Sequence, residues 1–255
     1  MEFHQQLLTE NDCYKSGRSI RPQGVMVHST GANNPRLSRY VAPNDGLLGE
    51  PALRHWNQSG TGACTHAFIG KLEKGGVAVY QTLPWTMRGW HAGRGSRGSA
   101  NDTHISFEIC EDDLEDPKYF QAVYRAAVEL TAKLCQEFQL DPTQDGVVIC
   151  HSEGYARGIA TNHADVTHWF PKFKKDMDQF RADVVTELEG GEGMTQEQFD
   201  RLLEDWLERK ASQPSAAWAG PVLKQAIAAG WTDGTRPQAF ATRQEVAAMI
   251  LAAKK

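Results

Sequence analysis

Several features that would place this chain in a particular class are missing from its sequence. It has no hydrophobic run long enough to span a membrane. Neither a basic segment nor an apolar core occurs in its first residues, MEFHQQLLTENDCYKSG, so we expect no secretory signal. Acidic and basic residues are interspersed and leave a net charge of −5. We therefore expect neither membrane insertion nor a nucleic-acid partner.

Cysteine is also scarce, and the number of cysteines is odd. The five residues are scattered and mostly lie in apolar runs: Cys13, Cys64, Cys110, Cys135 and Cys150. A disulfide framework would need paired cysteines, so this pattern favours reduced thiols.

The chain is long enough for one large domain and an appendage, since it has 255 residues of which 40% are hydrophobic. A glycine-rich stretch over residues 186–193, TELEGGEG, has no apolar period and predicts a linker. We expect a catalytic domain over residues 1–185 and a helical C-terminal module over residues 194–255.

Two short apolar runs that each end at a histidine carry the main chemical signal. Residues 24–27, GVMV, lead into His28, and residues 147–150, VVIC, lead into His151. Both runs predict buried strands. The loop after His151 carries His163 and Asp165. Two histidines and a carboxylate match the three protein ligands of a catalytic zinc site, although a lone histidine at a strand end is more often a hydrogen-bonded structural residue.

A third strand is predicted over residues 104–110, HISFEIC, because apolar residues alternate with Ser106 and Glu108. A carboxylate among apolar neighbours is costly unless it is paired or functional. Burial would raise the pKa of Glu108, as a general base requires. The alternative is a glutamate on an edge strand that faces water.

Aromatic and basic side chains gather at Trp90, His91 and Arg94. Flat rings stack on sugars and guanidinium groups pair with carboxylates, so this group suits a sugar-peptide substrate. A core tryptophan beside a solvated basic loop would give the same pattern.

The remaining elements of the domain follow from periodicity and turn residues. We expect an irregular lead-in over residues 1–23, a short helix over 53–58, strands over 63–70 and 77–83, and helices over 117–138 and 168–180.

Five separated motifs carry a family resemblance: VMVHST, CTHAFIG, RGWHAG, NDTHISFEI and CHSEGYARGIATNHAD. In this order, over about residues 20–180, they resemble the zinc-dependent N-acetylmuramoyl-L-alanine amidases of phages and bacteria, which are related to the peptidoglycan recognition proteins. The resemblance implies an α/β fold with a central mixed β-sheet flanked by helices. It also implies a Zn²⁺ cofactor and cleavage of peptidoglycan between N-acetylmuramic acid and the L-alanine of the stem peptide.

The resemblance assigns roles to individual residues. His28, His151 and Asp165 match the zinc ligands, with His163 or His168 as alternatives for the third. Glu108 matches the general base. His163 takes the position of a lysine in many members, where it would stabilise the oxyanion. The resemblance gives His66 a structural role.

An amidase without a visible signal segment is typical of a phage endolysin, which is made in the cytoplasm and acts on the cell wall after release. We therefore expect an endolysin, and the alternative is an autolysin. The alternative to an enzyme is a peptidoglycan-binding protein that has the same fold but no catalytic activity.

The C-terminal module begins with a predicted amphipathic helix over residues 194–210, with a capping box between Thr195 and Gln198. Residues 218–253 resemble an S-layer homology module, in which Thr242 would be the N-cap and Glu245 its partner. This resemblance implies a secondary cell-wall polymer as partner. The alternative is a small packing or dimerisation unit, which would make a homodimer.

Overall fold

The computed structural model describes residues 1–190 and 196–253. It divides into two compact units, Met1–Gly191 and Glu192–Lys255, which are described separately. In the described parts of the chain, no helix combines the length and apolarity that a membrane span requires.

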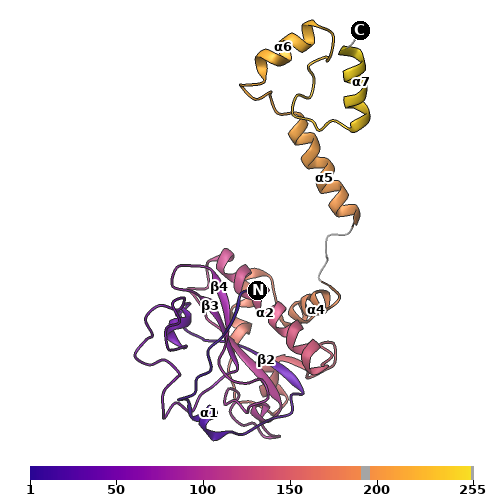
Figure 1. The fold of residues 1–255 in the computed structure, drawn as a ribbon. Coiled ribbons are helices and arrows are strands. Elements are labelled where there is room, and N and C mark those ends of the chain that lie inside the picture. Colours follow the sequence, from indigo (N-terminus) through magenta and orange to yellow (C-terminus); the bar gives the residue numbers. More distant parts are fainter. Residues whose placement is uncertain (191–195, 254–255) are drawn as a thin grey trace. The chain divides into compact units, whose positions relative to one another are not determined.

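The first unit is built on a six-stranded mixed sheet, as expected. Its strands are β1 (Phe3–Gln5), β2 (Gly24–Ser29), β3 (Ala67–Lys71), β4 (Val77–Gln81), β5 (His104–Ile109) and β6 (Val148–Cys150). They lie in the order β1-β4-β3-β5-β2-β6, and all neighbours are parallel except β3 and β4. Figure 1 shows β2, β3 and β4 within this unit. Because β3, β5, β2 and β6 run parallel, their carboxyl ends meet at one edge of the sheet, where the candidate site lies.

Four α-helices belong to this unit: α1 (Asp12–Ser16), α2 (Pro117–Phe138), α3 (His151–Ala156) and α4 (Met177–Leu188). The predicted boundaries of α2 are those observed. The Asp116 side chain caps this helix by accepting hydrogen bonds from the backbone N–H groups of Lys118 and Tyr119, and Pro117 occupies its first position. Helix α4 extends to Leu188, three residues into the expected linker, and residues 191–193 of that linker lie outside the described residues.

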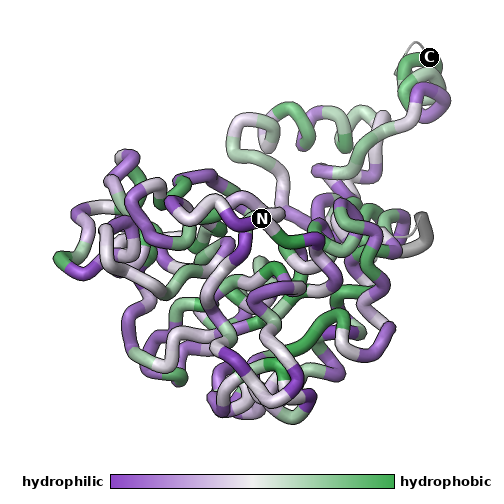
Figure 2. The backbone as a smooth tube through the Cα atoms, turned by 90° about the horizontal axis from the view of Figure 1, so that it is seen from below, coloured by the Kyte–Doolittle hydropathy of each residue, from purple (hydrophilic) through white to green (hydrophobic). Residues whose placement is uncertain are grey.

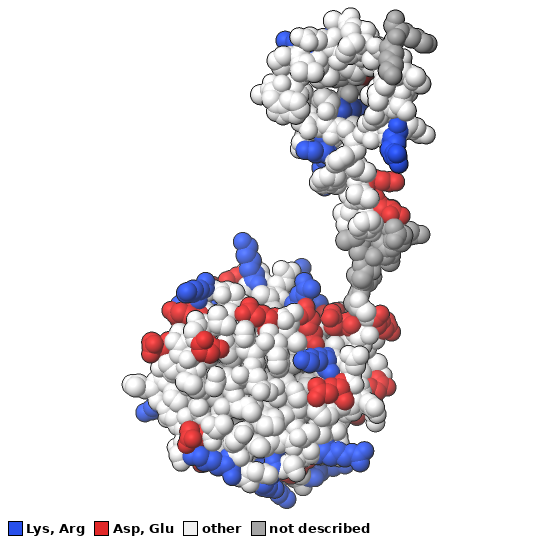
Figure 3. Space-filling model, viewed as in Figure 1, with Lys and Arg blue, Asp and Glu red and all other residues white. Residues whose placement is uncertain are grey.

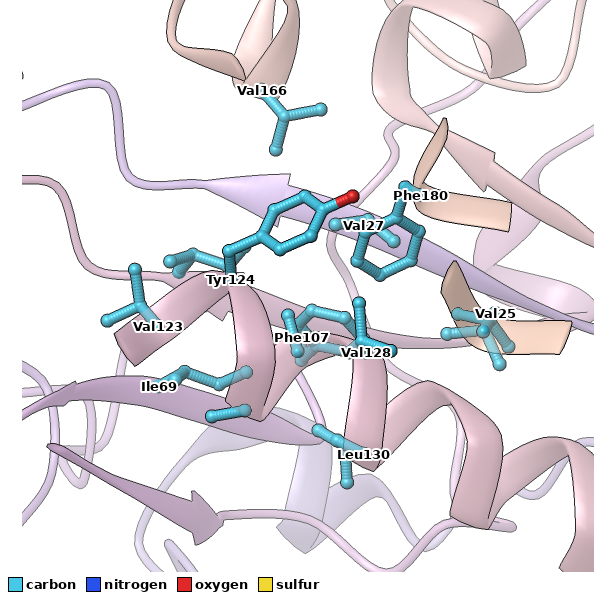
Figure 4. Close-up of a cluster of buried hydrophobic side chains, with 14 of the residues drawn as sticks. Val25, Val27, Ile69, Phe107, Val123, Tyr124, Val128, Leu130, Val166 and Phe180 are labelled. Carbon is cyan, nitrogen blue, oxygen red and sulfur yellow. The ribbon is translucent and has the colours of Figure 1, made fainter. Parts of the chain in front are cut away.

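One face of the sheet packs on α2 and α4 through apolar side chains, and Arg181 of α4 also donates a hydrogen bond to the Val148 carbonyl of β6. Val25 and Val27 from β2 and Phe107 from β5 are fully buried there. Figure 4 shows Val123, Val128 and other α2 side chains packed against these strand residues. Because successive strand residues point to opposite faces, Met26, His28, Ser106 and Glu108 face the other side.

Loops cover that other side. Leu37, Tyr40, Val41 and Leu48 pack over Phe68 of β3, and Ala92 and Ala100 pack over Met26 of β2. Close packing there depends on Gly24, where an added Cβ would lie 2.4 Å from the Val147 carbonyl oxygen and 2.7 Å from the His104 ring.

The expectation of reduced thiols throughout is wrong, because Cys13 and Cys64 form a disulfide with Cα atoms 6.4 Å apart. The two residues are 51 positions apart, and pairing over such a distance cannot be deduced from spacing. Cys110, Cys135 and Cys150 are free and buried, as expected.

Three local expectations also need correction. The first 23 residues are not wholly irregular, since β1 adds to the sheet edge beside β4 and α1 follows it. No helix forms over residues 53–58, where side chains bond to nearby backbone instead: Gln58 donates to the Leu53 carbonyl. Residues 165–173 form two 3₁₀ turns, Asp165–His168 and Phe170–Phe173, and α4 starts only at Met177. Lys174 ends the second turn in the left-handed region, with φ at 58°.

The second unit contains α5 (Gln196–Ala211), α6 (Gly220–Ala228) and α7 (Arg243–Ala253). Thr195, and with it the expected capping box, lies outside the described residues. At the start of α7 the Thr242 hydroxyl accepts a hydrogen bond from the Glu245 N–H, and the Glu245 carboxylate accepts one from the Thr242 N–H. Hydrophobic stretches occur along the C-terminal helices (Figure 2), and Trp218, Phe240 and Leu251 are exposed. The likeness to an S-layer homology module is not confirmed.

Candidate metal centre and active site

The three expected ligands come together at the carboxyl edge of the sheet. His28 is the fifth residue of β2 and pairs in register with Glu108 of β5. Val27 pairs with Cys150 at the end of β6, so the chain turns into α3 at His151 beside His28. Asp165 begins the 3₁₀ turn after the loop. The parallel arrangement of β2, β5 and β6 thus gathers residues from distant parts of the sequence.

The ligand atoms of this cluster have a spacing that suits a metal ion. His28 Nδ1 lies 2.8 Å from Asp165 Oδ2, His151 Nδ1 lies 3.2 Å from the same oxygen, and the two Nδ1 atoms are 3.2 Å apart. Two ligands of a tetrahedral zinc ion, each about 2.0–2.1 Å from the metal, lie about 3.3 Å from each other. In the described part of the chain, this is the one group of three such side chains close enough to hold an ion.

The protonation states in the cluster also suit metal binding. Burial lowers the pKa of His28, although the hydrogen bond with Asp165 opposes this effect. Burial would raise the pKa of Asp165, but hydrogen bonds with His151 and His28 outweigh it and hold this pKa below its usual value. His28 is therefore favoured as neutral and Asp165 as ionised, which are the forms that bind metal.

Asp165 has an unusual backbone conformation, with φ at 46°. Aspartate is one of the few residues other than glycine that adopts the left-handed region readily. Here this conformation lies at the point where the loop enters the 3₁₀ turn and the carboxylate meets both histidines. A backbone outlier at a ligand position is typical of a functional site.

Glu108 lies beside the cluster, at the register position opposite His28. Its side chain is partly exposed, but its Oε2 atom is buried and has no hydrogen-bond partner among the described residues. Burial raises the pKa of Glu108 well above the usual carboxyl value, and the nearby charges of Asp165 and Glu111 raise it further. The structure thus places the Glu108 carboxylate beside the cluster of His28, His151 and Asp165 and not on an edge strand that faces water.

A cleft of about 380 Å³ opens over the cluster. Trp90 and His91 line it, whereas Arg94 is exposed and is not among its lining residues. Trp90 is 48% exposed, and the Arg88 guanidinium lies 5.3 Å from its ring centroid. His91 also contacts the cluster itself, since its Nδ1 lies 3.0 Å from His28 Nε2.

The two alternatives for the third ligand lie at different distances from the cluster. His163 is exposed and lines the cleft, with its ring centroid 4.7 Å from that of His151. His168 instead bonds with the buried carboxylate of Glu111 at 3.1 Å. Neither belongs to the group that can hold a metal, so the geometry favours Asp165.

His66 has the structural surroundings that the sequence suggested. It is fully buried; its Nδ1 accepts a hydrogen bond from the Ser106 N–H, and its Nε2 donates to the Met87 carbonyl. Both nitrogens are therefore satisfied by backbone groups.

Sequence reasoning missed several residues around the cleft. Tyr40 and Trp56 line it from the loop-rich segment, and Thr161 contacts His151. Asn101 is fully buried and binds the backbone of residues 91–93. Asn101 and Thr161 lie inside motifs that carried the resemblance, which was a usable signal, but Tyr40 and Trp56 lie in no such motif and follow no periodic pattern.

Figure 3 shows acidic and basic side chains dispersed over the face of residues 1–190 in view, with uncharged surface between them. The cleft itself is lined mainly by neutral polar and aromatic groups. Recognition of a ligand there would depend on ring stacking and hydrogen bonds more than on net charge.

Comparison with known proteins gives a consistent result. Residues 18–168 match the sequence pattern of a family described as N-acetylmuramoyl-L-alanine amidase. A structure of Staphylococcus aureus hydrolase AmiA in complex with its ligand is similar, with a TM-score of 0.52 and 19% identity, over 75% of this chain and 86% of that one.

A mutant of PlyL is similar with a TM-score of 0.50 and 17% identity, over 73% of this chain and 99% of that one. No curated protein matches the chain. At these identities the structures show a shared fold, while the family pattern extends over more than half of the sequence. The cluster at the strand ends thus lies in a chain that belongs to the N-acetylmuramoyl-L-alanine amidase family.

Proposed function

We propose that this peptidoglycan amidase cleaves the amide between N-acetylmuramic acid and L-alanine with a zinc ion held by His28, His151 and Asp165. The observation that carries the proposal is the convergence of two Nδ1 atoms and one carboxylate oxygen within 3.2 Å of one another beside a partly buried glutamate. Three protein ligands leave a fourth position free, as catalytic zinc sites do.

Zinc, when bound, would polarise the amide carbonyl and lower the pKa of a water molecule. Glu108 would take the proton of that water and return it to the leaving amine of L-alanine. Its raised pKa suits both steps, because a group that titrates nearer neutrality can accept and then donate.

His163 would donate a hydrogen bond to the carbonyl oxygen as negative charge develops on it. Two observations support this role: the side chain is exposed to the cleft, and its ring stands next to His151. Because a histidine replaces the lysine common in the family, this contribution depends on the tautomer or charge of the ring.

The cleft would bind the glycan and stem peptide on aromatic surfaces. Trp90 stands at one wall, and Trp56 and Tyr40, whose rings meet edge to face with centroids 5.9 Å apart, form another. Arg94, outside the lining, could reach only parts of the substrate that extend beyond the cleft.

We further propose an endolysin or autolysin role, with synthesis in the cytoplasm and action on the wall after release. The C-terminal unit would bind a secondary cell-wall polymer or a second copy of the chain. Exposed aromatic side chains on that unit, Trp218 and Phe240 among them, support a binding role.

The decisive experiment measures new L-alanine amino termini released from purified peptidoglycan, by mass spectrometry, with zinc and after chelation. We expect release that disappears on chelation and in His28→Ala, while His55→Ala, in the partly buried loop outside the cluster, keeps it. Protein that holds zinc and binds the wall but releases nothing would instead identify the non-catalytic binding protein. Release that survives chelation would overturn the zinc mechanism.

A further inference from the structure

Each histidine of the cluster uses both of its ring nitrogens. The Nδ1 atoms of His28 and His151 point to the shared ligand position, while their Nε2 atoms contact other side chains. A histidine can bind a metal through Nδ1 only when the proton is on Nε2. The partners of the two Nε2 atoms therefore decide whether the rings are ready to bind.

The partner of His28 is a second histidine. His28 Nε2 lies 3.0 Å from His91 Nδ1. With the proton of His28 on Nε2, His91 Nδ1 must accept it, and the proton of His91 then lies on its own Nε2. The commoner acceptors for a metal-bound histidine are carboxylates, backbone carbonyls and water, so a neutral imidazole in this place is distinctive.

The partner of His151 is a hydroxyl. His151 Nε2 lies 3.3 Å from Thr161 Oγ1, and Thr161 Oγ1 donates to the Ala92 carbonyl at 3.3 Å. Since the hydroxyl proton is directed to Ala92, its oxygen is free to accept from His151. The Thr161 N–H also donates to the Ala92 carbonyl, at 2.9 Å. The partners of both ligands thus meet at one segment, residues 91–93.

Asn101 holds that segment in place. Its Oδ1 accepts the N–H groups of His91 and Ala92, at 2.8 and 2.9 Å, and its Nδ2 donates to the Gly93 carbonyl at 3.1 Å. Its side chain is fully buried. Asn101 lies in the 3₁₀ turn Ala100–Asp102, just before β5, the strand that carries Glu108.

His91 also carries a cost that packing alone does not explain. Its Nε2 atom is buried and has no hydrogen-bond partner among the described residues. A buried polar atom without a partner is destabilising, and an aromatic hydrocarbon of the same shape would avoid the loss. The contact with His28 gives a reason for a histidine at this position.

We propose that His91 and Thr161, held by Asn101, are positioning residues that fix the tautomer and orientation of the two metal-binding histidines. This inference rests on the proposed zinc site. It also gives His91 a new role, since the sequence had suggested direct contact with substrate.

The test compares two replacements of His91 by zinc affinity, measured by competition with a chromogenic chelator in the full chain. His91→Phe keeps a ring but removes the acceptor. His91→Asn keeps an oxygen at about the place of Nδ1, so it can accept from His28. We expect zinc binding to weaken about 10- to 100-fold in His91→Phe and to return to within a few-fold of the original in His91→Asn.

A second pair of variants addresses the other branch. Thr161→Val removes the hydroxyl with little change of shape, and Thr161→Ser keeps it. We expect weaker zinc binding for valine and near-original binding for serine. Thermal unfolding of the zinc-free proteins shows whether each variant is folded, and affinities are compared among folded variants only.

Three outcomes would distinguish failure of the proposed zinc site from failure of the positioning role. If the unaltered chain binds no zinc, the proposed function fails at its first step. If it binds zinc and folded His91→Phe binds as tightly, the positioning role alone is overturned. If phenylalanine and asparagine weaken binding equally, the acceptor at Nδ1 is not the reason for the histidine, which also overturns it.

Discussion

The two faces of the central sheet are built from the same strands but have different properties. Along β5, Ile105, Phe107 and Ile109 pack into the apolar layer under α2, while Ser106 and Glu108 face the loops. On the helix side the tyrosine hydroxyls have partners: Tyr119 donates to the Cys110 carbonyl and Tyr124 to the Asp183 carboxylate. The loop side contains four buried histidines, each with hydrogen-bond partners: His28, His66, His104 and His151.

This difference shows how the fold separates stability from chemistry. A helix packed on a sheet supplies a continuous apolar contact, whose value depends on buried area. Loops can present side chains of any kind over the opposite face, because their backbone follows no repeating pattern. Because side chains alternate along a strand, adjacent residues can serve different ends: Phe107 packs in the core, and Glu108 faces the candidate site.

The largest expected effect belongs to the loop face. Glu108→Gln should lower kcat about 10²- to 10⁴-fold, because it removes the proposed proton acceptor. The thermal midpoint should not fall, since glutamine keeps the shape and removes a buried charge. Amide hydrolysis and thermal unfolding of the zinc-loaded protein test both expectations, with the exposed Glu115→Gln as the matched control. If the thermal midpoint of Glu108→Gln fell enough to explain its lower activity, the expected separation of chemistry on the loop face from stability on the helix face would be contradicted.

The next effect belongs to the helix face. Phe107 is fully buried against α2, so Phe107→Ala should lower the free energy of unfolding by about 3–5 kcal/mol. Under conditions where the variant is folded, its kcat should stay near that of the unaltered protein. Urea unfolding measures the change, and Leu53→Ala, at a side chain that is 95% exposed, should change little. A large fall in kcat of folded Phe107→Ala would show that the two faces are not independent.

The smallest expected effect is on the pH dependence of stability, and it concerns His66, which lies on the loop face but is fully buried. Burial lowers the pKa of His66 to about 4, from an ordinary value of 6.5. Between these values the unfolded chain binds a proton that the folded chain does not, so stability falls as the pH falls from about 6.5 to about 4. A shift of this size corresponds to about 3 kcal/mol.

Urea unfolding of zinc-free protein across this pH range checks the prediction. His66→Gln should show a shallower dependence on pH than the unaltered chain, although the other buried histidines still contribute. Coincident slopes would mean that His66 is not responsible for this part of the pH dependence.

Sequence alone predicted the parts of the fold that follow a regular period. The long amphipathic helix α2 is predicted at its observed boundaries because its apolar residues recur at helical spacing and Asp141-Pro142 follows its end. The β2 and β6 strands were found from short β-branched runs, and the histidines that follow them do meet. The assignment of Asp165 and Glu108 to the same site as these histidines depended more on the family motifs than on residue spacing.

The rest depends on contacts that no local pattern records. Which cysteines pair follows from where α1 and the loop before β3 come to lie, and both positions are set by tertiary packing. The contact between His91 and His28 likewise joins residues 63 positions apart. The 3₁₀ turns after Asp165 were predicted as a helix because the aromatic spacing is helical, while Pro171 and the left-handed Lys174 break the helix.

The bond between Cys13 and Cys64 closes the intervening chain into a covalent ring. That ring includes His28 and the whole segment that supplies Tyr40 and Trp56 to the cleft. A protease that cuts beside the exposed Leu53 would therefore leave both pieces tethered, and the nicked protein would migrate as one species until a reductant separated it.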